Sequence, residues 1–347
     1  MTYQRPGETK GALRLHLNEN TAGCSPAVIE ALRTIERDLI ALYPDYGPAI
    51  EACARWLGVE PGWVQLVNGL DEGLHASAQA ARNREPPHPR PEAVIVEPAF
   101  EMYVPCAEAA GLTVVPIPPQ PGFAFPLAPL LRAISPATRL IYLTDPNNPT
   151  GLAIPPGAIE RVAEAAPAAI VLVDEAYADF SGRTQIGSPL DRRRNLVVGR
   201  TFAKAHGLAG LRAGALAGHP EALAGIRRVL PPFSINVCAA VALEAALRDR
   251  AYLDWYVAES VESRQLIYDC CSRLGLPYWK SEANFVLVRV GPDAAALVRA
   301  VSDRDVLIRD RSTQPGCDGC IRMTAGVVEH TRAALTALEA ALASRHR

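Results

Sequence analysis

The stretch "RLIYLTDPNNPTGLAIPPGAIERVAEAAPAAIVLVDEAY" (139–177) sets two apolar runs on either side of a turn and an amphipathic segment. The runs at 139–144 and 169–174 are nearly continuous in apolar residues rather than alternating, as expected of strands that are covered on both faces. Residues 155–167 between them indicate a helix. A strand, a helix and a second strand in this order predict a parallel pair joined by a crossover helix.

The same alternation extends in both directions, from about residue 60 to residue 220. A further helix is indicated by "GLDEGLHASAQAARNR" (69–84). Further strand-like runs are "EAVIVEPAF" (92–100), "LTVVPIPP" (112–119), "NLVVGRTFAK" (195–204) and "RAGALAG" (212–218). Alternating strands and helices predict an α/β fold with an open, mostly parallel sheet flanked by helices.

The character of the sequence changes after about residue 233. A long helical region that breaks near Arg250 is followed by strand-like runs at 284–290, 305–312 and 320–326 and by a final alanine-rich helix. This pattern predicts a smaller α+β domain. Near the N-terminus we expect one helix, from about Pro26 with Ser25 as its cap, packed against that smaller domain. We therefore divide the chain into a large domain, 35–235, and a small domain, 1–34 with 236–347.

Composition excludes several classes of protein. The 347-residue chain is 49% hydrophobic and 21% charged, and its formal net charge is -2. Charges of both signs are scattered, so nothing indicates a surface for nucleic acid or for an anionic membrane. No apolar run reaches the ~20 residues of a membrane span, and the first residues lack the apolar core of a secretion signal. These features favour a cytoplasmic protein.

The pattern of the eight cysteines also agrees with a cytoplasmic protein. They are scattered, apart from Cys317 and Cys320 in "CDGC". A zinc site normally adds a second pair or histidines at ligand spacing, and none follows. We expect no metal site and interpret this pair as free thiols at a turn.

Polar residues follow the apolar runs where ligands bind in open α/β sheets, beyond the carboxyl ends of the strands. Asp174 ends one run, Tyr177 comes three residues later, and Asn148 lies in the turn "TDPNNPTG" (144–151). A buried, unpaired carboxylate is costly, so Asp174 should need a cationic partner. Gly69 opens a helix whose first N–H groups can hold an anion. Each signal is weak alone, because ion pairs, turns and helix starts are common.

Only three of the cationic residues are lysines: Lys10, Lys204 and Lys280. Lys10 lies in a polar tail and Lys280 in "YWKSEANF", and we expect both on the surface. Lys204 lies among small and apolar residues in "RTFAKAHGLAGLR" (200–212). A lysine in such surroundings has a lowered pKa and can form a Schiff base, which an arginine cannot. Together with the carboxylate and the helix start described above, Lys204 predicts a site for pyridoxal 5′-phosphate (PLP).

In chain order, "NPTG", "VDEAY", "FAKAHGLAGLR" and "IRMTAG" resemble the motifs of the fold-type I PLP-dependent (class I/II) aminotransferases. More narrowly, "LHLNEN", "YPDY", "NGLDEG" and "LIRDRSTQPGCDGCIRMTAG" are similar to the histidinol-phosphate aminotransferases, from about Leu15 to the C-terminus. The resemblance implies a homodimer with shared active sites. It also implies amino transfer between L-histidinol phosphate or its keto form, imidazole-acetol phosphate, and glutamate or 2-oxoglutarate in histidine biosynthesis.

The resemblance further implies roles for single residues. Lys204 would form the Schiff base and move the substrate proton, and Asp174 would pair with the pyridinium nitrogen. Asn148 and Tyr177 would hydrogen-bond the ring hydroxyl, and Phe100 would stack on the ring. The residues implied to hold the cofactor phosphate are Leu70, Asp71, Thr201, Arg212 and, from the other subunit, Tyr43.

Two positions depart from the pattern of that family. Ala203 stands where a serine often supplies a phosphate hydroxyl, which lowers the expected cofactor affinity unless Thr201 suffices. Asn20 stands where an aromatic residue is sometimes found.

For the substrate, the resemblance implies Arg322, the arginine that binds a carboxylate in most aminotransferases, together with Asn148. Arg309 in "LIRDRS" matches a second arginine of the family. Two guanidinium groups suit a phosphate dianion better than one. The plainer interpretation of Arg309 is a surface ion pair with Asp310 or Asp305.

Three other functions stay open at this point. A threonine-phosphate decarboxylase shares the fold and acts on a phosphorylated substrate, and other aminotransferases of the fold act on aromatic or specialised substrates. A non-catalytic PLP-binding module of a transcription regulator would need a basic DNA-binding segment, which the sequence lacks. Its retained Lys204 and Asp174 also argue against that module.

Overall fold

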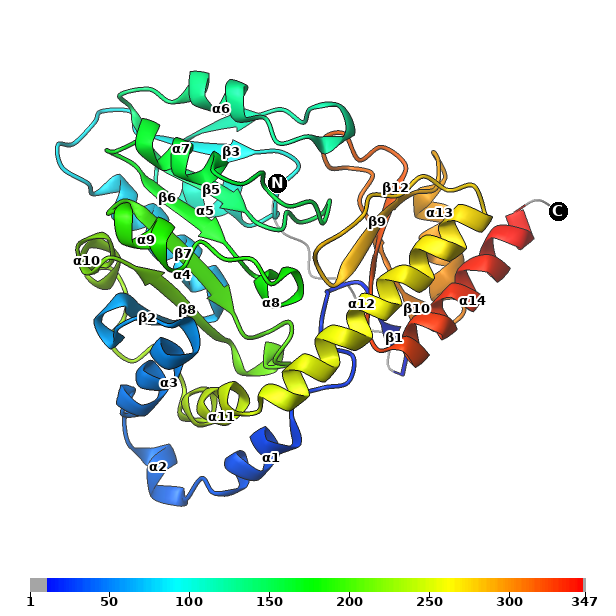
Figure 1. Ribbon diagram of the computed structural model, residues 1–347, viewed down its shortest axis with the longest axis horizontal. Coiled ribbons are helices and arrows are strands. Elements are labelled where there is room, and N and C mark those ends of the chain that lie inside the picture. The colour runs from blue at the N-terminus through cyan, green and yellow to red at the C-terminus, as the bar shows by residue number, and fades with distance from the viewer. Residues whose placement is uncertain (1–10, 346–347) are drawn as a thin grey trace.

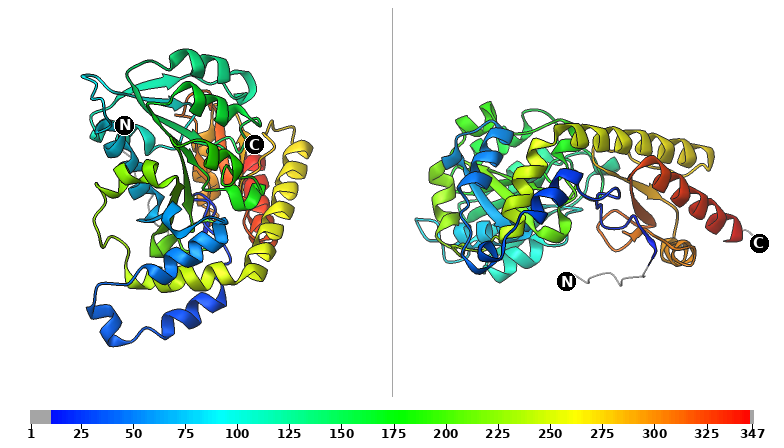
Figure 2. Two further views of the ribbon diagram at one scale, coloured as in Figure 1. Left: turned by 60° about the vertical axis from the view of Figure 1, so that its left-hand side comes forward. Right: turned by 90° about the horizontal axis from the view of Figure 1, so that it is seen from below.

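The computed structural model describes residues 11–345, so Lys10 lies outside the described residues. One large sheet with its helices forms the greater part of the molecule, and two smaller sheets lie beside it (Figure 1). The long helix α12 (Arg250–Arg273) runs from the large part to the small part, as both views of Figure 2 show.

The large sheet has the strand order β2-β8-β7-β6-β5-β3-β4. Its strands are β2 (Val64–Asn68), β3 (Glu92–Val96), β4 (Thr113–Ile117), β5 (Thr138–Thr144), β6 (Ile170–Asp174), β7 (Leu196–Thr201) and β8 (Ala213–Gly218). From β4 to β7 neighbouring strands are parallel, whereas β8 is antiparallel to both β7 and β2. The predicted α/β fold with a mostly parallel sheet is confirmed. Strand β2 was not predicted, because its short sequence VQLVN mixes polar and apolar residues.

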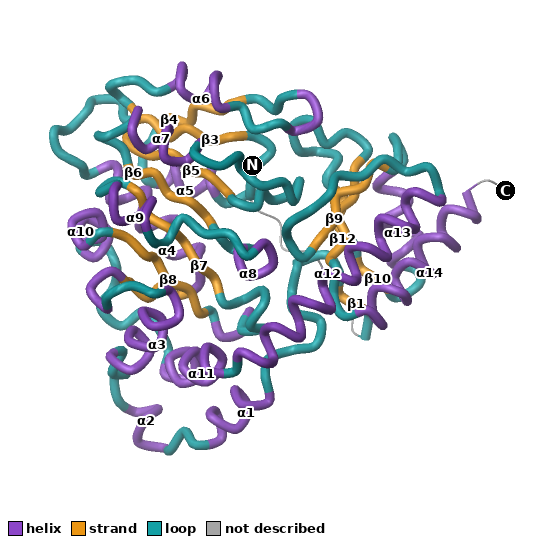
Figure 3. Tube along the Cα trace, viewed as in Figure 1, coloured by secondary structure: helices purple, strands orange, loops and turns teal. Residues whose placement is uncertain are grey.

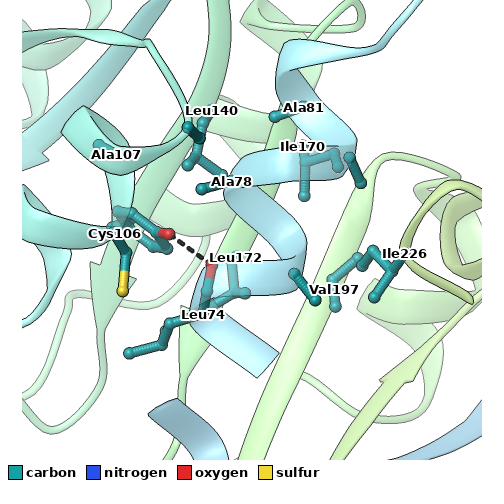
Figure 4. Close-up of a cluster of buried hydrophobic side chains, with 14 of the residues drawn as sticks. Leu74, Ala78, Ala81, Cys106, Ala107, Leu140, Ile170, Leu172, Val197 and Ile226 are labelled. Atoms are coloured by element: carbon teal, nitrogen blue, oxygen red, sulfur yellow. Dashed lines mark hydrogen bonds between the residues drawn. The ribbon is translucent and has the colours of Figure 1, made fainter. Parts of the chain in front are cut away.

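Helices cover both faces of the large sheet (Figure 3). One face carries α4 (Gly69–Arg82), α5 (Tyr103–Ala109) and α10 (Pro220–Arg227), and the other carries α6 (Leu127–Ala133), α7 (Ala158–Ala165) and α9 (Ser188–Arg192). Within β5, Leu140 packs on the first face and Ile141 on the second. Figure 4 shows the first core, in which Leu74 and Ala78 of α4 lie with Leu140 and Leu172 of the strands. Because both faces are covered, the strand sequences are apolar without alternation.

Further helices pack beside β2 and β8. There α1 (Pro26–Arg33), α3 (Gly47–Leu57) and α11 (Val237–Arg248) share a core that includes Val28, Cys53 and Leu243. Ser25 caps α1 by accepting a hydrogen bond from the N–H of Ala27, as predicted. A second short helix, α2 (Arg37–Ala41), was not predicted.

The N-terminal segment contacts both parts of the molecule. Strand β1 (Leu13–Arg14) pairs in parallel with β10 (Val306–Leu307) of the small part, whereas α1 packs with α11 and α3 beside the large sheet. The division into residues 35–235 and 1–34 with 236–347 remains our proposal.

The small part is built on an antiparallel sheet with the order β11-β12-β9, made of β11 (Arg309–Asp310), β12 (Cys320–Thr324) and β9 (Phe285–Arg289). Helices α12, α13 (Ala294–Ser302) and α14 (Val328–Arg345) pack on it. The helical region breaks at Asp249, as predicted near Arg250, and the Asp249 carboxylate caps α12 through the N–H of Tyr252. The remaining short helices are α8 (Ala178–Ser181) and the 3₁₀ turns Pro61–Trp63, Pro121–Phe123 and Ala209–Leu211.

Cys317 and Cys320 are buried free thiols. They lie at a turn in which the N–H of Cys320 donates to the carbonyl of Cys317, and they pack with Leu287. Among the described residues, no helix is long and apolar enough to cross a membrane.

Candidate active site

A cavity of about 860 Å³ lies between the large sheet and the small sheet. Thr144, Asp174 and Thr201, the last residues of β5, β6 and β7, reach its wall. This is the edge at which parallel sheets bind ligands. Of the residues predicted for the site, the structure brings together around this cavity Leu70, Asp71, Phe100, Asn148, Asp174, Tyr177, Thr201, Lys204, Arg212, Arg309 and Arg322.

Lys204 follows β7 and lies at the cavity wall, where its Nζ donates a 2.9 Å hydrogen bond to the carbonyl of Leu17. Burial, and after it the positive charge of Arg322, lowers the pKa of Lys204 to about 8. The lowered pKa expected from the apolar sequence around Lys204 is confirmed. Only the neutral amine is a nucleophile, so Lys204 is suited to form a Schiff base near neutral pH. Lys280 is exposed, as predicted.

Asp174 is buried at the end of β6, with 4% of its surface exposed. The cationic partner expected from the sequence is not supplied by residues 11–345, within which no lysine or arginine forms an ion pair with Asp174. Its carboxylate instead accepts hydrogen bonds from the hydroxyl of Tyr103 at 2.8 Å and the N–H of Ala176 at 2.9 Å. Burial raises the pKa of Asp174 to about 6. A buried carboxylate with hydrogen bonds but no cation fits a protonated pyridine nitrogen.

Tyr103 is a site residue that sequence reasoning missed. Besides its bond to Asp174, its hydroxyl lies 2.6 Å from Oγ1 of Thr144. Its ring stacks on Tyr142 at 4.7 Å and meets Phe100 edge-on at 5.7 Å. Tyr103 thus fixes the orientation of the carboxylate and supports the ring of Phe100. No local pattern indicates its contact with Asp174, 71 residues away.

The N-terminus of α4 lies at one end of the cavity, beside Arg212. Gly69 has a φ of +71°, and its N–H donates a 2.8 Å bond to the carbonyl of Arg212. A Cβ at Gly69 would overlap the guanidinium of Arg212, so this close approach needs a glycine. Arg212 also pairs with Asp71 at 3.0 Å. The N–H groups of Leu70 and Asp71, which have no partner within the helix, and this cation together suit a phosphate.

Thr201 adds a hydroxyl at the same end. Its Oγ1 accepts a 3.2 Å bond from the N–H of Ala203, so the hydroxyl hydrogen remains for an acceptor. Ala203 lines the cavity with only a methyl group.

Asn148 and Tyr177 are each oriented by one hydrogen bond. Arg322 donates to Oδ1 of Asn148 at 2.5 Å, and Nδ2 of Asn18 donates to the hydroxyl of Tyr177 at 3.0 Å. The amide hydrogens of Asn148 and the hydroxyl hydrogen of Tyr177 are then the groups that can be donated to a ligand. Burial raises the pKa of Tyr177, so the hydroxyl keeps its proton at neutral pH. Asn18, within "LHLNEN", was not predicted as a site residue.

Three arginines, two in the small sheet and one directly after β11, form what we call the arginine wall: Arg309, Arg322 and Arg311. Arg309 and Arg322 are directly opposed across β11 and β12, and Arg311 lies two positions beyond Arg309. The alternative ion pair of Arg309 with Asp310 or Asp305 is wrong, because Arg309 approaches Glu101 instead. Spacing could have found Arg311, since residues i and i+2 of a strand share a face.

The arginine wall carries uncompensated positive charge. Arg322 is 3% exposed, and its Nη2 donates to the carbonyl of His16 at 2.8 Å. Burial, and after it the charge of Arg311, lowers the pKa of Arg322 to about 9. Burial and the neighbouring arginines also lower the pKa of His16 to about 4, so this imidazole is neutral at physiological pH. Among residues 11–345 one carboxylate, that of Glu101, contacts the wall, which leaves two net positive charges for a dianion.

Tyr43 is the predicted site residue that does not line the cavity of its own chain. It is 77% exposed, and its ring stacks on Phe233 at 4.2 Å. The family resemblance implies a place for Tyr43 in the site of another subunit, and its exposure leaves it accessible to one.

The family model described as "Aminotransferase class I and II" matches residues 10–338. The histidinol-phosphate aminotransferase of Moorella thermoacetica is 33% identical, with 98% of this chain and 88% of that protein covered. Histidinol-phosphate aminotransferase 2 of Ralstonia nicotianae is 35% identical, with coverage of 97% and 90%. The crystal structure of histidinol-phosphate aminotransferase from Sinorhizobium meliloti in complex with pyridoxal-5'-phosphate superimposes with a TM-score of 0.84, at 27% identity and coverage of 96% and 91%.

Proposed function

The chain belongs to the class I and II aminotransferase family, and we propose that it exchanges an amino group between L-histidinol phosphate and 2-oxoglutarate, giving imidazole-acetol phosphate and glutamate in histidine biosynthesis. The observation that carries this proposal is the opposed pair Arg309 and Arg322 on the cavity wall. The curated relatives that are named histidinol-phosphate aminotransferases support it.

The enzyme uses pyridoxal 5′-phosphate, as its family implies. When bound, this cofactor supplies a ring that takes up the electron pair released at the substrate carbon. We propose that Lys204 binds it covalently and that the N-terminus of α4 holds its phosphate with Thr201 and Arg212. The residues of this end of the cavity fit such a group, since Gly69 lets the arginine approach the helix.

Three side chains would hold the ring in its reactive form. Asp174 would keep a proton on the ring nitrogen, because a buried carboxylate without a cation gains most from that charge. Tyr177 and Asn148, oriented by Asn18 and Arg322, would donate hydrogen bonds to the ring oxygen. Phe100 would cover one ring face, supported by Tyr103.

Lys204 would also carry the proton of the reaction. Once an amino substrate has taken its place, the Nζ of Lys204 is a free amine in the cavity. Its lowered pKa lets this amine accept a proton from the substrate carbon and return it without a large energetic cost.

The two substrates share one anion site. The phosphate of L-histidinol phosphate would bind Arg309 and Arg322 together, as a dianion facing two guanidinium groups. Glutamate would place its α-carboxylate on Arg322, which Asn148 and the carbonyl of His16 hold in position. Arg309 then distinguishes the phosphorylated substrate from the carboxylate substrate.

We propose a cytoplasmic homodimer in which Tyr43 reaches the cofactor phosphate of the partner subunit. Exposed apolar side chains on α1, α2 and the 229–233 segment support this, since exposed apolar patches are typical of interfaces. The exposed large side chains in and next to these elements are Ile29, Leu39, Ile40, Leu42, Tyr43, Val229 and Phe233.

The proposed function is tested by a half-reaction screen. Each candidate amine is added to purified holoenzyme, and the absorbance of the cofactor is followed as it accepts the amino group. We expect conversion by L-histidinol phosphate and by glutamate. Release of carbon dioxide from O-phosphothreonine, without conversion by L-histidinol phosphate, would instead identify a decarboxylase.

A further inference from the structure

Glu101 extends from the large part of the molecule into the anion site. It lies between β3 and α5, directly after Phe100. Its Oε1 accepts a 2.7 Å bond from Nη1 of Arg311, and its Oε2 lies 3.4 Å from Nη2 of Arg309. A carboxylate beside the arginines proposed to bind the substrate phosphate weakens the binding of that phosphate, because like charges repel.

The two contacts of Glu101 are unequal. Arg311 is almost fully buried, its bond to Glu101 is short, and a buried guanidinium without a carboxylate would be strongly unfavourable. The side chain of Arg309 is 20% exposed, and its contact is near the limit of a hydrogen bond. Glu101 can therefore leave Arg309 while it remains paired with Arg311.

We propose that Glu101 is an internal competitor for Arg309, displaced when the phosphate of a substrate binds, and that Arg311 is the residue that retains it. The inference rests on the proposed function, in which Arg309 binds phosphate. A dianion with three oxygens competes well against one carboxylate. Glu101 thus weakens the binding of phosphorylated ligands so that they can be released, and it leaves ligands without a phosphate unaffected.

The loop that carries Glu101 is held independently of this carboxylate. Nε2 of Gln314 donates a 3.1 Å bond to the carbonyl of Ala99, which also joins the small part to this loop. Glu101→Gln should therefore remove the charge and leave the position of Phe100 unchanged. Glu101→Asp is a second variant, because it keeps the charge but is too short to span both arginines.

The test is calorimetric titration of inorganic phosphate into holoenzyme, with retained cofactor absorbance and thermal melting as folding controls. Glu101→Gln should bind phosphate about twofold to fivefold more tightly, the range expected of one partly exposed ion pair. In kinetics, KM for L-histidinol phosphate should fall without a rise in kcat, and kcat/KM for L-histidinol should not change.

Two controls separate competition between Glu101 and phosphate for Arg309 from the general effect of removing a negative charge from the cavity. Glu19→Gln removes another carboxylate of the same cavity, one paired with Arg14 rather than with the arginine wall, and should give a smaller gain. In an Arg309→Gln background, Glu101→Gln should give no gain beyond that of Glu19→Gln. Equal gains from the two glutamine variants, or a persistent gain without Arg309, would overturn the proposal.

Substitution of Arg311 gives a second test, in which the affinity for phosphate should fall rather than rise. Arg311→Gln should weaken phosphate binding, because Glu101 then pairs with Arg309 alone, and adding Glu101→Gln should restore it. If the second change restores nothing, Arg311 is itself a phosphate ligand and the proposal fails. Because inorganic phosphate is the probe, these results decide the role of Glu101 even if L-histidinol phosphate proves not to be the amino donor.

Discussion

Arg309 and Arg322 occupy directly opposed positions on β11 and β12, and both reach the cavity wall. Opposed side chains on one face of an antiparallel pair lie close together. Burial and then the charge of Arg311 lower the pKa of Arg322 most, and the repulsion by Arg309 lowers it further. Binding of a dianion removes the repulsion, so the geometry favours a substrate with a phosphate over one with a single carboxylate.

Lys204→Ala should abolish the covalent attachment of the cofactor and essentially all turnover. The α4 end of the cavity is unchanged in this variant, so PLP should still bind, without a covalent bond. Borohydride reduction of the wild-type holoenzyme, followed by peptide mapping, should find the cofactor on Lys204. The matched control is Lys280→Ala, which changes an exposed lysine and should keep activity. A cofactor label on Lys280 or Lys10 would disprove the assignment.

Asp174→Asn should leave a folded protein that contains PLP but whose turnover is lower by several orders of magnitude. The amide keeps the shape of the carboxylate and loses the charge that holds the proton on the ring nitrogen. Steady-state kinetics of the variant, with cofactor content measured in the same sample, tests this role. Near-normal turnover would show that Asp174 has only a structural role.

Without cofactor, the Asp174→Asn variant should differ from wild type in thermal stability. Asp174 has a pKa of about 6 in the folded protein, above the usual value near 3.9. Below about pH 4 the carboxyl is protonated in both the folded and the unfolded state, so its ionisation does not change the free energy of unfolding. Above about pH 6 the carboxyl is buried as an anion, which destabilises the folded apoprotein by up to about 3 kcal/mol. Apoprotein carrying Asp174→Asn should therefore melt at a higher temperature than wild type at pH 7, and the difference should shrink toward pH 4. Equal melting curves at both pH values would argue against the raised pKa.

Gly69→Ala should weaken PLP binding about tenfold or more, because a Cβ at a positive φ, placed against Arg212, strains the phosphate end of the cavity. The dissociation constant of PLP from the apoprotein measures the effect. Gly62→Ala is the matched control, since a Cβ there meets no atom within 4 Å. If the two variants bind PLP with equal affinity, Gly69 and Arg212 do not hold the cofactor phosphate.

Much of the fold was predictable because local sequence patterns indicate its strands and helices. Strands covered on both faces give continuous apolar runs, and the residue that ends such a run, as Asp174 ends β6, lies at the ligand edge. The small and apolar sequence around Lys204 likewise indicated a lowered pKa, which the structure shows.

The residues that sequence reasoning missed act through contacts distant in the chain. Tyr103 reaches Asp174 across 71 positions, Asn18 reaches Tyr177 across 159, and Glu101 reaches Arg309 across 208. No periodicity or spacing encodes such pairs. They follow only from the way in which the N-terminal segment and the small sheet close over the ends of the parallel strands.

Tyr43 should complete the site of the partner subunit. A Lys204→Ala protein mixed with a Tyr43→Phe protein should form hybrid dimers in which one of the two sites has both residues intact. Activity above that of either parent would support a shared site, since neither parent contains such a site. If hybrids form and no activity returns, Tyr43 acts within its own chain.

The central claim is that Arg309 and Arg322 select a phosphorylated amine, and the most direct measurement is kcat/KM for L-histidinol phosphate relative to L-histidinol, in wild type and in Arg309→Ala. Each charge-assisted contact contributes roughly 1.5–3 kcal/mol, so the wild-type ratio should be at least ~100. Arg309→Ala should remove most of this preference and affect glutamate less, whereas Arg322→Ala should impair both half-reactions. A wild-type ratio near one, or a preference that survives in Arg309→Ala, would contradict the account.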